Sequence, residues 1–67
     1  MTNTQLLRKH ILSKGYKYKY LAKEMGLSPY GLQKKIDNNT EFKASEIKKL
    51  VKILNLSSGE QDKIFFA

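Results

Sequence analysis

The fold is decided by residues 18–36, which read YKYLAKEMGLSPYGLQKKI. In the first half of this stretch, Leu21 and Met25 stand four residues apart, which is the spacing of one buried helical face. Ala22 is small enough to let a second helix approach closely, and Gly26 suits the left-handed conformation that ends many helices. These features predict a helix that begins near residue 18 and ends at Met25.

The second half of the stretch begins with two signals for a helix start. Ser28 is a good N-cap residue, and Pro29 fits the first helical position, where its missing N–H leaves no hydrogen bond unmade. Leu32 and Ile36 then form a pair that points inward, again four residues apart. We therefore predict a second helix over residues 29–37, joined to the first by a short turn.

The flanking sequence predicts three further helices. Residues 4–14 and residues 44–54 both show amphipathic helical spacing. Ser57 and Glu60 form a capping box for a short fifth helix that reaches the C-terminal aromatic residues. The buried positions that we expect in these segments are Leu6, Leu7, Ile11, Leu12, Ile47, Leu50, Val51 and Leu54, with Phe42 as an apolar plug ahead of the fourth helix.

Length and composition restrict the class of protein. The chain has 67 residues, so we expect a single domain over residues 1–67. It contains no cysteine, and helix packing must therefore stabilise the core without disulfides or thiolate-bound zinc. The polar start MTNTQ does not match a secretory signal, and no apolar run approaches the length of a membrane span. We predict an all-α, compact five-helix domain in the cytoplasm.

The positive charge lies almost entirely in the first half of the chain. The whole sequence carries 13 basic and 6 acidic residues, which give a net charge of +7. Residues 1–36 hold eight of the basic residues and one acid, Glu24, whereas residues 37–67 hold five lysines and five acids. A basic half predicts binding to a polyanion such as nucleic acid, because phosphate neutralisation releases counterions. A lysine-rich solubilising surface is the alternative, and charge alone does not separate the two.

Residues 15–36, which read GYKYKYLAKEMGLSPYGLQKKI, resemble a known protein family. The specific parts of this stretch are Leu21-Ala22, Gly26, Leu27-Ser28, and Leu32 with Ile36. The pattern resembles the XRE family of helix-turn-helix proteins, which is typified by the lambdoid phage repressor and Cro. The later sequence is similar to the version common in phages and mobile elements of Gram-positive bacteria, through Phe42, Ser45-Glu46-Ile47, Leu54-Asn55-Leu56-Ser57 and Ile64-Phe65-Phe66.

The resemblance implies a lambda-repressor-like helix-turn-helix domain whose third helix reads the major groove of DNA. Residues just after the cap of that helix, and one a turn later, would then contact base edges. Pro29 and Tyr30 occupy the first positions and Lys34 the later one, and a lysine ammonium can donate to guanine O6 or N7. Gln33 is a further candidate. The candidates for phosphate contacts are Lys17, Tyr18, Lys19, Ser28, Asn38 and Lys43, together with the free amides at the start of the fourth helix.

The chain departs from the family pattern near this site. Lys17 stands where a polar cap usually precedes the second helix, and Tyr18 replaces the glutamine that often follows. Gly31 costs roughly 1 kcal/mol of helix propensity relative to alanine. Either glycine is used here because it lets the backbone lie close to the groove or move freely there, or the loss of helix propensity is simply tolerated.

The resemblance implies a Cro-like transcriptional regulator that represses by occupying double-stranded operator DNA and excluding polymerase. Small repressors of this kind usually bind as two-fold dimers to half-sites about 34 Å apart, so we expect a homodimer, in solution or only on DNA. Two adjacent rings cannot both point inward from one helix end, and one of them is therefore expected to face a partner. The candidate dimer or partner surface consists of Ile64, Phe65 and Phe66.

Two other functions remain open, and both use a protein partner. An antirepressor would bind a larger phage repressor, and an antitoxin would bind a toxin. A decoy that occupies a DNA-binding face should be acidic, which argues weakly against the first. We expect no enzyme, because the sequence has no nucleophile-base pair or phosphate loop, and we expect no cofactor. The lone His10 has no second histidine or cysteine with which to share a metal, so no metal site is expected.

Overall fold

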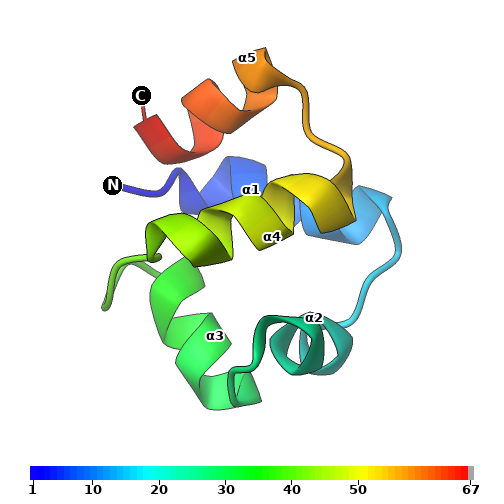
Figure 1. Cartoon of the computed structure of the whole chain (residues 1–67), viewed down its shortest axis with the longest axis vertical. Coiled ribbons are helices and arrows are strands. Elements are labelled where there is room, and N and C mark those ends of the chain that lie inside the picture. The colour runs from blue at the N-terminus through cyan, green and yellow to red at the C-terminus, as the bar shows by residue number, and fades with distance from the viewer. Residues whose placement is uncertain (67) are drawn as a thin grey trace.

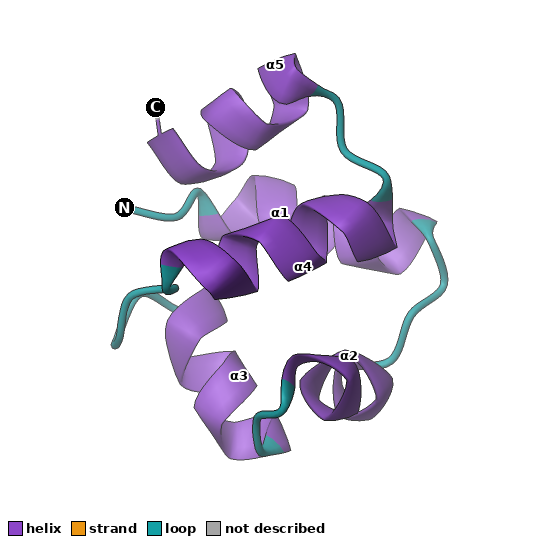
Figure 2. Cartoon of the chain, in the orientation of Figure 1, coloured by secondary structure: helices purple, strands orange, loops and turns teal. Residues whose placement is uncertain are grey.

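Several helices begin or end at a residue whose chemistry favours that end. The computed structural model describes residues 1–66, which contain five α-helices and no strand (Figure 2). None of these helices is long and apolar enough to cross a bilayer. In chain order the elements are α1 (Thr4–Ser13), α2 (Tyr18–Met25), α3 (Pro29–Ile36), α4 (Ala44–Leu54) and α5 (Ser58–Gln61), which continues as the π-helical segment η1 (Asp62–Phe66).

Both ends of α2 and the start of α3 lie where the sequence predicts them, whereas α3 ends at Ile36, one residue before the predicted end. Gly26 has a φ of 69° and ends α2 in the left-handed region. The Oγ of Ser28 accepts a hydrogen bond from the Gly31 amide at 3.0 Å, and Pro29 is the first residue of α3. This cap satisfies one of the amides that have no partner in the first turn of a helix. Lys17, which precedes α2, makes no side-chain cap.

The four helices α1, α2, α3 and α4 and the segment η1 all contribute side chains to one apolar core. The inward pairs that helical spacing predicts in the first three helices are all buried. Phe42, Ile47 and Val51 are partly buried against the same core, as expected. The buried apolar residues are Leu7, Ile11, Leu21, Ala22, Met25, Leu32, Ile36, Leu50, Leu54, Leu56, Ile64 and Phe65.

The expectation that Leu12 belongs to this core is wrong. Its side chain is 80% exposed, whereas the neighbouring Ile11 is buried. Successive residues of a helix point about 100° apart, so Leu12 lies well away from the stripe formed by Leu7 and Ile11. Leu6, on the other side of that stripe, is half-buried and packs against the core. The buried face of α1 is therefore narrower than the sequence suggests.

The helices separate into two ends with α1 and α4 between them (Figure 1). α2 and α3 pack against each other at one end, and α5 with η1 lies at the other (Figure 1). The N-terminal segment lies beside η1, because the Asn3 amide donates a hydrogen bond to the Ile64 carbonyl at 2.6 Å. The α2 and α3 pair is thus presented at the end of the molecule away from α5.

Candidate nucleic-acid interface

The outer face of α3 carries the four residues that the sequence predicts as base contacts. Leu32 and Ile36 are buried on the opposite side and fix which way the helix is turned. Tyr30 is 73% exposed, and Lys34, one turn later, is half-buried. We call the following set the outer face of α3: Pro29, Tyr30, Gln33 and Lys34.

Lys34 lies over the ring of Tyr30 on this face. Its Nζ is 5.5 Å from the ring centroid, within the range of a cation–π interaction. Lys34 forms no ion pair within residues 1–66. Its charge is therefore not neutralised by a carboxylate, and the ammonium keeps donors that a ligand can use.

Two ion pairs hold α3 on the rest of the protein. Arg8 of α1 pairs with Asp37, the residue that follows α3. Lys35 donates to the Oε1 of Glu46 on α4 at 2.9 Å, and to the backbone carbonyl of Glu41 at 3.1 Å. Two acids near the turn after α3, Asp37 and Glu46, thus pair across helices and orient α3.

Glu46 combines this ion pair with a helix cap. Burial alone would raise the pKa of Glu46, but hydrogen bonds from the Lys43 amide and from Lys35 outweigh it and lower that pKa below its ordinary value. The Lys43 amide donates to Oε1 at 2.8 Å. One of the amides proposed for phosphate binding at the start of α4 is therefore already occupied by the protein itself.

The side chain of Asn38, a candidate phosphate contact from sequence, makes its hydrogen bonds within the protein. Its Nδ2 donates to the Thr2 carbonyl at 2.7 Å and to the Oγ1 of Thr4 at 3.2 Å. Its Oδ1 accepts a hydrogen bond from the Thr2 amide at 2.9 Å. The side chain is thus committed to the N-terminal segment. With a φ of 65°, Asn38 also occupies the left-handed region that the turn after α3 requires.

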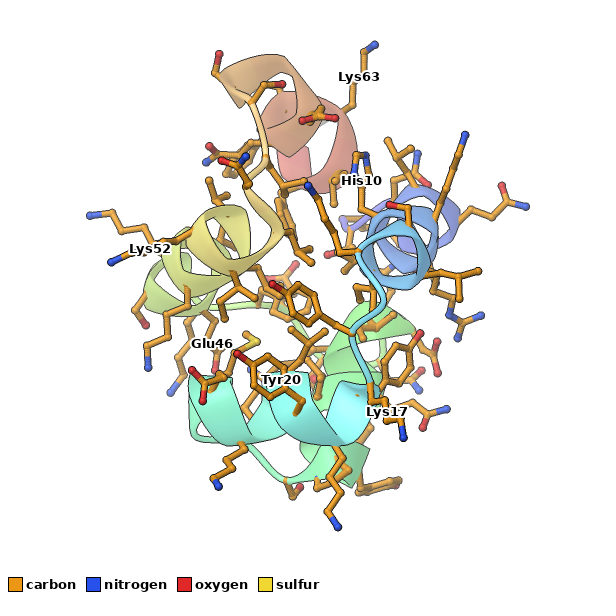
Figure 3. The ribbon with its side chains drawn as sticks, turned by 90° about the vertical axis from the view of Figure 1, so that its right-hand side faces the viewer. His10, Lys17, Tyr20, Glu46, Lys52 and Lys63 are labelled. Carbon is orange, nitrogen blue, oxygen red and sulfur yellow. The ribbon has the colours of Figure 1, made fainter. Side chains whose placement is uncertain are left out.

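The other phosphate candidates surround the α2 and α3 pair. Lys17 and Lys19 are exposed at the start of α2, and Figure 3 shows Lys17 at that end of the helix. Tyr18 is half-buried and packs on the core. Ser28 is exposed but its Oγ already accepts the capping hydrogen bond, and Lys43 is exposed at the start of α4.

Lys23 is not among the phosphate contacts predicted from sequence, and it adds to this basic surface. It is exposed on α2, four residues after Lys19, so both side chains share one face of the helix. That spacing was the signal that could have found it. Neither lysine forms an ion pair within residues 1–66. By contrast, Arg8 and Lys35 are paired, so the basic half offers less free charge than its composition suggests.

One protein-family model matches nearly the whole chain, and the match includes nearly all of these features. The model of the family described as "Protein of unknown function (DUF739)" matches residues 3–67, which include every helix and the whole α2 and α3 surface. The chain belongs to the DUF739 family. No curated protein and no solved structure matches it. The family description assigns no activity, so the site itself is the evidence for a function of this DUF739 protein.

The C-terminal end of the DUF739 protein divides its aromatic residues between core and surface. Ile64 and Phe65 are buried, which removes them from the partner surface proposed from sequence. Phe66 is 63% exposed, so one ring of the pair faces outward as expected. Phe65 meets Phe42 edge to face, with ring centroids 5.8 Å apart. A pocket of about 170 Å³ adjoins them, lined by Met1, Thr2, Asn38, Glu41, Phe42, Ile47, Phe65 and Phe66.

Titratable side chains of α1 and α5 contact each other at one end of the DUF739 protein. No three potential metal ligands come together within residues 1–66. His10 on α1 faces Glu60 at 3.7 Å, and Figure 3 shows His10 beside the C-terminal helix. Hydrogen bonds from the amide and hydroxyl of Ser57 lower the pKa of Glu60 below its ordinary value. These contacts hold α5 against α1.

Proposed function

We propose that this DUF739 protein is a sequence-specific double-stranded DNA-binding transcriptional regulator of the Cro or repressor kind. Its α2 and α3 form a lambda-repressor-like helix-turn-helix. In this proposal α3 enters the major groove of an operator and α2 braces it, and the bound protein blocks transcription in the cytoplasm of a bacterial cell. The observation that carries the proposal is the outer face of α3, which is polar and accessible while its inner pair is buried.

The dimensions of α3 support this proposal. With its side chains, an α-helix such as α3 is about 10–12 Å in diameter. The major groove of B-DNA is about 12 Å wide and admits an α-helix. Lys34 and Gln33 supply hydrogen-bonding groups for base edges, while Tyr30 supplies a hydroxyl and an apolar ring.

The exposed lysines of α2 support phosphate binding beside the groove. Lys17, Lys19 and Lys23 are exposed on the helix that packs against α3. Phosphate contacts position a protein on the duplex, whereas base contacts specify the sequence. We therefore assign the affinity for any duplex largely to α2 and the preference among sequences to α3.

The test is selection of bound duplexes from a random DNA pool, followed by fluorescence anisotropy on the selected sequence. We expect a motif with two symmetric half-sites about 34 Å apart, bound by two copies of the chain. Lys34→Ala should weaken binding to the selected duplex about tenfold or more and leave binding to random duplex nearly unchanged. Lys52→Ala, on α4, is the matched control and should change neither. The proposal fails if no duplex is enriched at low salt.

Exposure of Phe66 favours a second candidate function, in which the chain acts on a protein partner. A ring that is 63% exposed beside a pocket fits an antirepressor that binds a larger phage repressor, or an antitoxin that binds a toxin. Affinity capture with the repressor or toxin encoded beside this chain tests it. Capture that is lost in Phe66→Ala, together with the absence of any DNA binding, would favour this function over the first.

A further inference from the structure

Lys34 is the lysine of α3 whose position is set by a ring and not by a carboxylate. The neighbouring Lys35 is taken up by Glu46, whereas the Nζ of Lys34 lies 5.5 Å from the centroid of Tyr30. A free lysine side chain samples many rotamers, and ordering it on binding costs affinity. An ammonium that already lies over a ring is partly ordered before DNA binds, so ordering it on binding costs less.

The contact leaves the ammonium able to bind. A ring engages the ammonium from one side through its electron-rich face. The lysine ammonium has three donors, so those that point away from the ring stay available. Guanine presents two acceptors, O6 and N7, at its major-groove edge, and a lysine can donate to both.

Tyr30 serves no evident structural role that would explain its ring. It is 73% exposed, and its hydroxyl makes no hydrogen bond within residues 1–66. By comparison, Tyr16 is partly buried and its hydroxyl donates to the carbonyl of Ile53. The ring of Tyr30 therefore acts on the surface, where its neighbour is the Lys34 ammonium.

We propose that Tyr30 is a positioning residue for Lys34, and that the pair acts as one unit that selects a guanine in each half-site. This inference rests on the proposed function. Tyr30 stands four residues before Lys34, about 6 Å along the helix axis, which is between one and two base-pair steps of about 3.4 Å. At that distance its apolar edge meets a nearby base pair, where the methyl group of a thymine is the apolar feature of the major groove. The operator chemistry is therefore a guanine with a thymine close by.

The first part of the test uses the free protein and needs no DNA. The Hε protons of Lys34 should be shifted upfield by the ring current of Tyr30 in the NMR spectrum. Tyr30→Phe keeps the ring and should keep the shift, whereas Tyr30→Leu should abolish it without lowering the melting temperature. The Hε protons of Lys52 and Lys63 are the internal controls and should not move. An unshifted Lys34 in the unmodified protein overturns the positioning role.

The second part is a double-mutant cycle on the selected duplex. Tyr30→Leu should weaken binding about two- to fivefold, which is the range of an exposed cation–π interaction, and Tyr30→Phe should not. In a Lys34→Met background the same Tyr30→Leu change should have much less effect. Replacing the guanine by 7-deazaguanine, which lacks N7, should likewise reduce the effect, and replacing the thymine by uracil should weaken binding only when the ring is present.

The outcomes separate this inference from the proposed function. Equal losses from Tyr30→Leu in the presence and absence of Lys34 would mean that the ring contributes only through its own contact with DNA, and they would overturn the positioning role. A selected site without guanine would overturn the assignment of the base. If no duplex is enriched, the proposed function fails and guanine selection fails with it, while the NMR shift still decides whether Tyr30 positions Lys34.

Discussion

The side chain of Asn38 joins the turn after α3 to the N-terminal segment through three hydrogen bonds. Two reach the backbone of Thr2 and one reaches the hydroxyl of Thr4, which itself donates to the carbonyl of Ile36. The backbone of Asn38 is also in the left-handed region, with a φ of 65°. One residue therefore sets both the path of the chain after α3 and its contact with the start of α1.

These two roles of Asn38 can be separated by substitution. Asn38→Gly keeps the backbone conformation and loses the hydrogen bonds, so it should lower the free energy of unfolding by about 1–2 kcal/mol. Asn38→Ala should cost about 1 kcal/mol more, because alanine disfavours the left-handed region. Urea denaturation measures both. Asn39→Ala, at the exposed neighbouring position, is the control and should change stability by less than about 0.5 kcal/mol. Equal losses for glycine and alanine would contradict the backbone role.

Ser28 is the residue that starts α3, and its hydroxyl can be tested alone. Ser28→Ala removes the acceptor for the Gly31 amide and should destabilise the protein by about 1 kcal/mol in thermal or urea denaturation. Ser45→Ala is the matched control, since Ser45 is exposed within α4 and makes no side-chain hydrogen bond within residues 1–66. If the two variants unfold alike, the cap contributes nothing measurable to α3.

At the scale of elements, α3 is oriented by polar pairs on both sides. Arg8 ties the end of α3 to α1 through Asp37, and Lys35 ties the last turn of α3 to α4 through Glu46. The side chains of Lys35 and Glu46 are 14% and 10% exposed, so this pair is more protected from water than a surface salt bridge. The apolar face of α3 binds it to the core, and these pairs fix its rotation and tilt.

The pair between α3 and α4 predicts a pH dependence of stability. The folded protein lowers the pKa of Glu46, so the unfolded chain takes up the proton first as the pH falls. The stabilisation is complete above the ordinary glutamate pKa of 4.5, and it is lost as the pH falls through the lower pKa of the folded state. Glu46→Gln should therefore cost about 2 kcal/mol at pH 7 and flatten the loss of stability below pH 4.5.

The control for this experiment is Glu41→Gln. Glu41 is exposed, and its side chain forms no ion pair within residues 1–66. Urea denaturation at a series of pH values should leave the curve of this variant parallel to that of the unmodified protein. A Glu46→Gln curve as steep as the unmodified one would show that the pair does not determine the acid response.

At the scale of the whole molecule, the free lysines are spread over different ends of the fold. Lys17 lies immediately before α2, Lys52 extends from α4, and Lys63 lies near the C-terminal end (Figure 3). The principal extents are 28 × 24 × 20 Å, so these charges are separated by distances at which salt screens them from one another. A duplex seated on α2 and α3 therefore senses the first of them more than the others.

This distribution predicts a difference in salt dependence between lysine variants. Lys17→Ala should weaken binding to all duplexes similarly and should reduce the slope of log K against log salt concentration by about 1. Lys52→Ala, which removes the same charge from α4, should leave the slope unchanged. Anisotropy titrations from low to physiological salt measure both. Equal reductions in slope would mean that charge acts through the whole molecule and not through α2.

Local sequence was sufficient to predict the helices. The bounds of α2 match the residues expected, and α3 begins at Pro29 behind the Ser28 cap. Caps and inward pairs depend on residues within four positions of one another, so their physics is contained in short stretches of sequence. The residues on the outer face of α3 could be placed for the same reason, because a buried pair fixes the opposite side of a helix.

Tertiary packing decided which polar groups of the DUF739 protein remain free. Arg8 and Asp37 are 29 positions apart in sequence, and Asn38 and Thr2 are 36 apart, so no helical period predicts that they meet. The same packing buries Phe65, leaves Phe66 outside and excludes Leu12 from the core. The sequence by itself determined the helices, their ends and the basic half. Only the angles and distances between helices determined which charges of that half are paired internally and which, such as Lys34 and Lys17, are left for a ligand.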